Sequence, residues 1–137
     1  MAGNAAPIFS KVGQIDWGTV LTAANTAVDG TGTVITVFTA DATNGGWCEE
    51  LIWMPLGTNV VTVGRAFVNN GSTNGTAANN SMISQIQLPA TTLNNAAPLF
   101  VPHQPIRLAL PAGYKINVVI ATAVSAGFMI TGVGGKY

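Results

Sequence analysis

Short runs of alternating apolar and polar residues, separated by small polar breaks, recur along the whole chain. No stretch of about eleven residues carries the apolar 3.6-residue stripe of an amphipathic helix. An eighth strand-like patch lies within residues 7–20, and the seven clearest runs are 33–39, 47–54, 60–68, 81–88, 106–110, 114–122 and 127–133. Seven or eight short strands at this spacing predict an all-β fold, an antiparallel β-sandwich of the jelly-roll-like kind.

The breaks between the runs contain residues that favour turns. Asn44-Gly45, Asn70-Gly71 and Asn74-Gly75 are expected to take positive φ at low cost. Residues 110–114, with a proline and a glycine, are typical of a turn between two strands. Pro89 and Pro105 are expected at strand borders, where the missing N–H does least harm.

The alternation also indicates which strands are buried. Both faces of residues 60–68 lack charge apart from Arg65, so this strand is expected to be covered on both sides, with a neighbouring subunit as one possible cover. Residues 116–135 carry no charge and are long enough to span a bilayer. Their glycines and β-branched residues favour a buried β-hairpin over a membrane helix.

Two segments depart from this compact pattern. Residues 1–28 are irregular and rich in small residues, which predicts an extended N-terminal arm or an edge segment before a β-sandwich domain over residues 29–137. Residues 69–81 form a polar loop of low complexity, NNGSTNGTAANNS. A loop of this length is often functional or mobile, but the favoured interpretation is an exposed connection between two strands.

Charged side chains are scarce. Five basic and five acidic residues make up 7% of the 137 residues, where about 25% is usual. Hydrophobic residues make up 48%, enough for a folded core. The scarcity argues against a free-standing monomer, and the absence of a basic stripe argues against a nucleic-acid partner. The N-terminal residues have no basic and long apolar pattern, so no secretion signal is expected.

Residues for catalysis are few. The one histidine, His103, lies in a proline-flanked loop, so we expect a surface or interface residue and not a catalytic base. Glu49 and Glu50 form the only adjacent carboxylate pair. On a strand they are expected to point to opposite faces, which prevents joint acid–base work and favours ion pairs with Arg65, Arg107 or a neighbouring subunit.

Metal and phosphate sites have equally little support. One cysteine and one histidine are too few for a structural zinc site. A chance site built across subunits from Asp16, Asp29 or Asp41 stays open, although residues 29–32 lack the ligands of a calcium loop. The glycine-rich C-terminal end lacks the hydroxyl residue and helix of a phosphate loop. We therefore expect no catalytic residue, no cofactor and no metal.

Three tryptophans allow two interpretations. Trp47 and Trp53 have the same parity on one expected strand, and Trp17 lies near the N-terminal patch. Such residues stack on sugar rings in lectins, or pack into a core or a subunit interface, where tryptophan is enriched. The second interpretation is favoured.

Several stretches resemble small structural proteins of tailed bacteriophages. The resemblance covers roughly residues 29–137, and its most specific pieces are PLGTNV with the following NNGSTN loop, and LPAGYKINV. The matching stretches are GTGTVITVFTA (30–40), PLGTNVVTVGRAFVNNGSTNGTAANN (55–80), LPATTL (88–93) and LALPAGYKINVVIATAVSAGFMITGVGGKY (108–137).

This resemblance implies a non-enzymatic capsid decoration or cement protein that binds and stabilises a shell of major capsid protein. It implies a homo-oligomer, with a trimer favoured, located on the virion surface after synthesis in the host cytoplasm. The alternative is a tail or fibre component that binds carbohydrate or a receptor, and a small hydrolase is a third possibility. The residues expected at interfaces are Phe9, Trp17, Trp47, Trp53, Arg65 and Tyr137.

Overall fold

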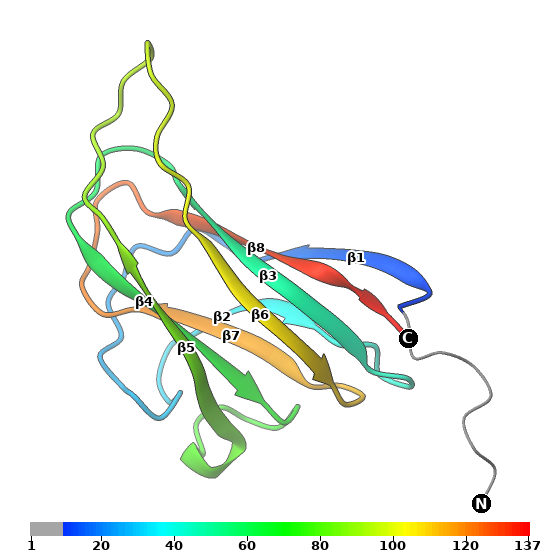
Figure 1. Ribbon diagram of the computed structural model, residues 1–137. Helices are drawn as coiled ribbons and strands as arrows, with labels where there is room; N and C mark the ends of the chain where they lie inside the picture. Colours follow the sequence, from blue (N-terminus) through cyan, green and yellow to red (C-terminus); the bar gives the residue numbers. More distant parts are fainter. Residues whose placement is uncertain (1–9) are drawn as a thin grey trace, which may run out of the picture.

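The computed structural model of the protein describes residues 10–137 and shows two four-stranded antiparallel sheets (Figure 1). Sheet I contains, in spatial order, β1 (Val12–Trp17), β8 (Phe128–Lys136), β3 (Gly46–Pro55) and β6 (His103–Leu110). Sheet II contains β2 (Ile35–Thr39), β7 (Lys115–Ile120), β4 (Thr62–Asn69) and β5 (Asn80–Leu88). A short 3-10 turn, η1 (Ala77–Asn79), precedes β5. The all-β sandwich predicted from the alternation is confirmed.

The strands pair like a long hairpin that has been rolled up. β1 pairs with β8, β2 with β7, β3 with β6 and β4 with β5, all antiparallel. Among the described strands only β4 and β5 are both consecutive and paired, so every other connection crosses between the sheets. This nested arrangement of eight strands is a jelly roll.

One sequence expectation is wrong at this level. Residues 116–135 do not form a β-hairpin, because β7 lies in sheet II and β8 in sheet I. The alternation predicted both strands correctly, but it contains no information on which sheet each strand joins. In the part of the chain that the structure describes, no helix is long and apolar enough to cross a membrane.

The core lies between the two sheets and is centred on Trp53. Its ring meets the Phe128 ring edge to face, with centroids 6.3 Å apart and planes at 76°. Gly64 of sheet II makes room for the indole, since a Cβ there would lie 2.7 Å from the ring. The Trp53 indole N–H donates to Gln104 Oε1 at 2.9 Å, and Gln104 Nε2 donates to Ser84 Oγ at 3.0 Å. The polar groups of this buried cluster are therefore satisfied.

A β-bulge in sheet I reverses the alternation along β3. Between Cys48 and Glu50, β3 has one residue more than the facing part of β8, and this additional residue is Glu49. The facing part of β6, from Pro105 to Leu108, has in turn one residue more than β3. The inward side chains are therefore Cys48 before the bulge and Leu51 and Trp53 after it. Two expectations are wrong for this reason. Trp47 and Trp53 lie on opposite faces, and Glu49 and Glu50 both lie on the outer face.

The bulge coincides with an unusual backbone conformation in β6. Arg107 has φ 52°, the only positive φ of a non-glycine residue among residues 10–137. Such a conformation costs a non-glycine residue roughly 1–2 kcal/mol. β6 also begins at His103, earlier than the run 106–110 indicated, so Pro105 lies inside the strand and not at its border. An edge strand tolerates the missing N–H of proline, and β6 is an edge of sheet I.

Candidate interaction surfaces

The outer face of sheet II is covered by the chain itself. Phe67 and Val119 face away from the main core, yet they are 0% and 1% exposed. The connection from β1 to β2 runs over this side. The backbone N–H of Asn25 donates to the Ile120 carbonyl at 2.8 Å, and Arg65 Nη1 donates to the Thr26 carbonyl at 3.3 Å. We call residues 24–33 the cover segment. Because Phe67 and Val119 are buried within the chain, the second layer over β4, for which a neighbouring subunit was one candidate, comes from the chain itself.

Asparagine side chains hold the cover segment in place. Asn25 Nδ2 donates to the carbonyls of Thr31 and Thr33 at 2.9 and 2.8 Å. Asn74, in the polar loop between β4 and β5, donates from Nδ2 to the Gly30 and Gly32 carbonyls at 3.2 and 2.7 Å. The loop of low complexity is exposed, as expected. Through Asn74 it also holds the cover segment in place. Its Asn70-Gly71 turn has the expected positive φ, whereas Gly75 does not.

The outer face of sheet I is apolar, and no segment among residues 10–137 covers it in this way. The register places Trp17 and Ile52 on opposite sides of Thr131, Ile15 beside Val133, and Met129 beside Met54. Three of these side chains are strongly exposed: Trp17 at 66%, Ile15 at 61% and Met54 at 42%. A solvated sheet face normally alternates to polar residues. We call this surface the bare face; it consists of Ile15, Trp17, Ile52, Met54, Met129 and Val133.

Charged residues lie along the β3–β6 side of the bare face. Arg107 Nε lies 3.4 Å from Glu49 Oε1, and His103 Nδ1 lies 3.2 Å from Glu50 Oε2. The Trp47 indole N–H donates to Glu49 Oε2 at 2.8 Å. Exposed pairs of this kind contribute at most about 1 kcal/mol. The arrangement of an apolar centre with a polar border resembles that of protein–protein interfaces.

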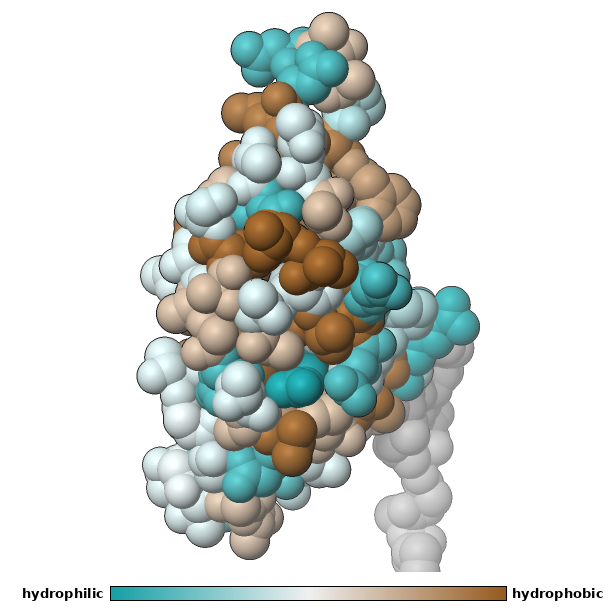
Figure 2. All heavy atoms as spheres, turned by 90° about the vertical axis from the view of Figure 1, so that its left-hand side faces the viewer, coloured by the Kyte–Doolittle hydropathy of each residue, from teal (hydrophilic) through white to brown (hydrophobic). Residues whose placement is uncertain are grey.

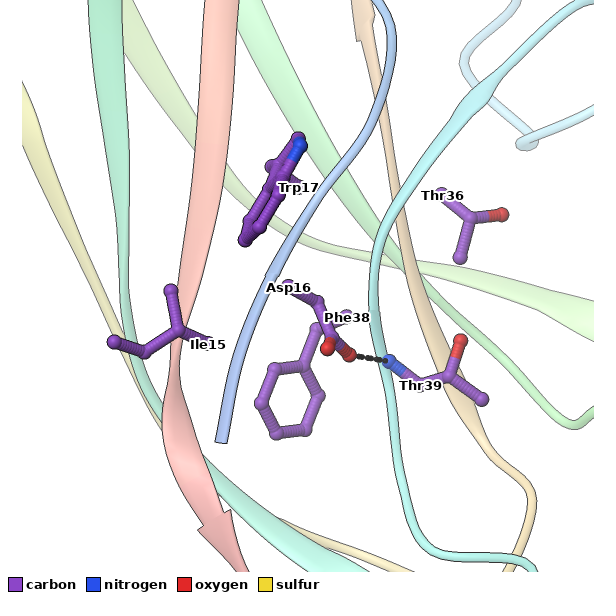
Figure 3. Close-up of a pocket in the computed structure, with 6 residues that line it drawn as sticks. All are labelled: Ile15, Asp16, Trp17, Thr36, Phe38 and Thr39. Atoms are coloured by element: carbon purple, nitrogen blue, oxygen red, sulfur yellow. Dashed lines mark hydrogen bonds between the residues drawn. The ribbon is translucent and has the colours of Figure 1, made fainter. Parts of the chain in front are cut away.

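An open groove of about 450 Å³ runs between the edge strands β1 and β2 (Figure 3). The Asp16 carboxylate reaches across to β2, where it accepts from the Thr39 amide at 3.0 Å. Gln14 Nε2 donates to the same Asp16 oxygen at 2.5 Å and to the Thr39 carbonyl at 2.6 Å. An inward-pointing charge of this kind protects an edge strand from pairing with another chain. The groove is lined by Ile15, Asp16, Trp17, Thr36, Phe38 and Thr39.

The connection from β5 to β6 projects from one end of the sandwich (Figure 1). We call residues 89–102 the β5–β6 arm. Its base is fixed by two backbone bonds between Asn59 and Thr91, at 3.1 and 2.9 Å, and by a bond from Thr91 Oγ1 to the Gly57 carbonyl at 2.7 Å. Leu93 and Phe100 are 58% and 67% exposed. Apolar side chains gather below its tip and on the end of the sandwich beneath it (Figure 2).

The residues expected at interfaces do not lie together on one surface. Trp17 lies on the bare face, and Trp47 is half-buried beside Glu49. Arg65 lies under the cover segment, and the Tyr137 amide donates to the Gly45 carbonyl at 3.3 Å. Trp53 is 0% exposed, so its expected place at an interface is wrong, because the bulge turns it into the core. Phe9 lies outside the described residues.

Several surface residues were missed by the sequence interpretation. Ile15 and Met54 of the bare face and Leu93 and Phe100 of the β5–β6 arm were not singled out. A signal was present for the arm, because residues 89–102 contain no ionisable side chain. For Met54 the signal was hidden, since its parity depends on the bulge.

The acidic residues support local turns. Hydrogen bonds from the Thr31 hydroxyl and amide lower the pKa of Asp29, and the Asn44 and Thr43 amides lower the pKa of Asp41. Within residues 10–137, no three His, Cys, Asp or Glu side chains lie close enough together to hold a metal ion. Burial, followed by the charges of Glu49 and Asp16, raises the pKa of the Cys48 thiol to about 12, so this thiol is not activated as a nucleophile.

The chain matches no protein-family model, no curated protein and no solved structure.

Proposed function

We propose that the protein is a non-enzymatic virion structural protein that decorates a capsid, binding the major capsid protein through the bare face. The observation that carries this proposal is the contrast between the two outer sheet faces. Phe67 and Val119 on the outer side of sheet II are buried within the chain, whereas Trp17, Ile15 and Met54 on the other side are exposed. A large exposed apolar face bordered by polar residues is typical of a binding surface.

The energetics fit attachment at many equivalent positions. Complete burial of an apolar side chain of this size contributes about 1.5–3 kcal/mol. The exposed parts of Trp17, Ile15 and Met54 therefore contribute at most about 5 kcal/mol per copy, which is near the lower end of an association cost of about 4–15 kcal/mol. The net charge of zero gives little long-range steering, so the contact depends on apolar burial and shape. Repetition on a lattice strengthens attachment through avidity.

The fold is compatible with this function and with the alternative. Jelly rolls occur in viral capsid domains and in lectins. The alternative, a tail or fibre module that binds carbohydrate or a receptor, relied on three tryptophans and on the polar loop of residues 69–81. One of these tryptophans, Trp53, is buried and hydrogen-bonded to Gln104. The bare face consists largely of aliphatic and methionine side chains, which favours a protein partner over a sugar.

The test uses shells of the source particle that lack this protein. Purified protein is added, and both the bound copies per shell and the thermal stability of the shell are measured. Met54→Lys is expected to weaken attachment more than tenfold, because it places a charge within the bare face. Gln87→Lys is the matched control on an exposed position of β5 in sheet II, and it is expected to bind like the original protein.

Two results would overturn the proposal. One is that the original protein fails to bind or stabilise the shells. The other is that Met54→Lys and Gln87→Lys bind equally well while both remain folded, as judged by their urea unfolding midpoints.

A further inference from the structure

We propose that a small polar pocket on the outer side of sheet II binds a sugar acid, that is, a polyhydroxylated ring that carries one carboxylate. The pocket has a volume of about 270 Å³ and is lined by side chains of β2, β7, the end of β4 and the polar loop that follows β4. In Figure 1 this loop lies at the end of the sandwich opposite to the β5–β6 arm. The pocket and the bare face belong to the outer sides of different sheets, so the pocket stays open when the bare face is covered.

The floor of the pocket is the outer face of sheet II. The register places Asn117 of β7 beside Thr36 of β2, and Lys115 of β7 beside Asn69 of β4. Lys115 and Asn117 lie on the same side of β7 as Val119, because successive residues of a strand alternate between its two faces. The outer face is therefore apolar around Val119 and becomes polar at the pocket.

Two connections of the chain complete the pocket. Val34 directly follows the cover segment, and the polar loop contributes residues 71–74. Asn74 joins the two connections, because its Nδ2 donates to the Gly30 and Gly32 carbonyls of the cover segment. A pocket whose parts are already fixed loses little conformational entropy when it binds a ligand.

The strongest sign of a ligand is an unpaired amide on the floor. Asn117 is only 3% exposed. Its Oδ1 accepts from the Thr36 hydroxyl at 2.7 Å, but its Nδ2 has no hydrogen-bond partner among residues 10–137. Both ends of the neighbouring Asn69 amide are paired, Nδ2 with Asn80 Oδ1 and Oδ1 with the Gly71 amide, each at 2.8 Å. Because an unpaired buried donor is costly, the Asn117 amide points to an acceptor group bound in the pocket.

Lys115 gives the pocket a single positive charge. Its side chain is partly buried, and it forms no ion pair within the part of the chain that the structure describes. No acidic side chain of these residues lines the pocket. An ammonium group in such surroundings forms charge-assisted hydrogen bonds with a carboxylate. One cation balances one carboxylate, whereas a phosphate group carries a charge of about −1.5 to −2 and would be left partly unbalanced.

The remaining lining suits the hydroxyl groups of a sugar. The Ser72 hydroxyl has no hydrogen-bond partner among the described residues, and Thr73 Oγ1 accepts from the Gly75 amide at 3.3 Å and keeps its own proton to donate. Hydroxyl and amide groups supply both donors and acceptors, as sugar hydroxyls do. Val34 adds an apolar contact for the C–H groups of the ring. The volume of the pocket is just below the range of about 300–1,000 Å³ for drug-sized ligands, which suits one sugar ring.

The test is an NMR titration of the isotope-labelled full chain without shell protein. The probes are glucuronate and N-acetylneuraminate. A ligand of this size, held by a few hydrogen bonds and one ion pair, is expected to have a dissociation constant of about 1 mM. The side-chain amide signals of Asn117 are expected to shift, and those of Asn95 in the β5–β6 arm are expected to stay unchanged. If neither sugar acid shifts the Asn117 signals, the proposal is wrong.

Three further probes separate a sugar acid from other ligands. Glucose has the hydroxyl groups without the carboxylate, acetate has the carboxylate without the ring, and inorganic phosphate has a higher charge. Each is expected to bind at least tenfold more weakly than the better of the two sugar acids. Equal affinity for acetate or phosphate would mean a general anion site, and equal affinity for glucose would mean that the charge of Lys115 has no role. Either result would overturn the proposal.

Variants locate the site. Lys115→Gln removes the charge and is expected to weaken binding of the sugar acid at least tenfold. Lys136→Gln, which changes an exposed lysine of β8 in sheet I, is the matched control and is expected to change the affinity by less than twofold. Ser72→Glu introduces a negative charge from an exposed loop position, so it remains informative if Lys115→Gln fails to fold, and it is expected to abolish binding.

Two outcomes of these variants would contradict the proposal. One is that the folded Lys115→Gln and Ser72→Glu proteins bind the sugar acid as the original protein does. The other is that Lys136→Gln weakens binding as much as Lys115→Gln. Met54→Lys is expected to lose shell attachment and keep sugar binding, because it lies on the opposite outer face. Since the titrations contain no shells, their failure would leave the proposed function intact.

Discussion

The two outer faces of the sandwich differ in whether their apolar residues are buried or exposed. On sheet II, Phe67 and Val119 are buried within the chain, and the cover segment on this side is fastened by Asn25 and Asn74. On sheet I, Trp17 and Ile15 stay more than half exposed. Within the described residues, the chain thus covers one face and leaves the other exposed. Since ordering a segment costs about 1–2 kcal/mol per residue, the covered face shows which apolar surface belongs to the subunit's own core. The bare face has no such role within the subunit.

The largest effect is expected from exchanging large for small residues on the two faces. Phe67→Ala is expected to lower the free energy of unfolding by about 3–5 kcal/mol, because it leaves a cavity under the cover segment. Met54→Ala on the bare face is expected to lower it by less than about 1 kcal/mol. Urea unfolding at a fixed protein concentration measures both. Similar losses for the two variants would mean that the faces do not differ in this way.

The second effect concerns the fastening of the cover. Asn74→Ala removes two hydrogen bonds to the Gly30 and Gly32 carbonyls, and is expected to destabilise the protein by about 1–2 kcal/mol. Amide hydrogen exchange should become faster in residues 24–33 and stay unchanged in β1 and β8. Asn95→Ala, at the exposed turn of the arm, is the control and is expected to change stability by less than about 0.5 kcal/mol. Faster exchange throughout both sheets would contradict a local role of Asn74.

A third test uses the inner side of sheet I. The folded state keeps Cys48 protonated up to about pH 12, whereas the unfolded chain loses this proton near its usual value of 9.0. The unfolded state therefore binds fewer protons above pH 9, and stability falls as pH rises through this window, by about 1.4 kcal/mol per pH unit. Cys48→Ala should lack this component of the slope. If the free energy of unfolding depended on pH in the same way for the original protein and for Cys48→Ala between pH 9 and 11, the thiol would not be buried.

The smallest effect is expected at the edge of the bare face. Arg107 has positive φ, which glycine tolerates and alanine does not. Both Arg107→Gly and Arg107→Ala remove the exposed ion pair with Glu49, so their difference reports the backbone alone. Arg107→Gly is expected to be more stable than Arg107→Ala by about 1 kcal/mol, as measured by chemical unfolding. The reverse order would show that this backbone conformation is not strained.

Much of the local structure follows from the sequence. Period-two alternation and β-branched residues are properties of neighbouring positions, and they place all eight strands to within a few residues. The turns at Gly45 and Gly113 follow from glycine, since both have positive φ. The scarcity of charge follows directly from composition, and it remains the reason to expect partners.

The candidate surfaces required the tertiary structure. Alternation shows that residues share a face, but one additional residue at Glu49 reverses the parity along β3 and places Trp47 and Trp53, which were expected on one face, on opposite faces. The pairing of Val12 with Lys136, from opposite ends of the described chain, follows from the packing of whole sheets. The sequence by itself determined which segments extend and where they turn, because these depend on near neighbours. Only the tertiary structure decided which apolar face is covered, because that depends on contacts between Asn74 and Gly30, 44 positions apart along the chain.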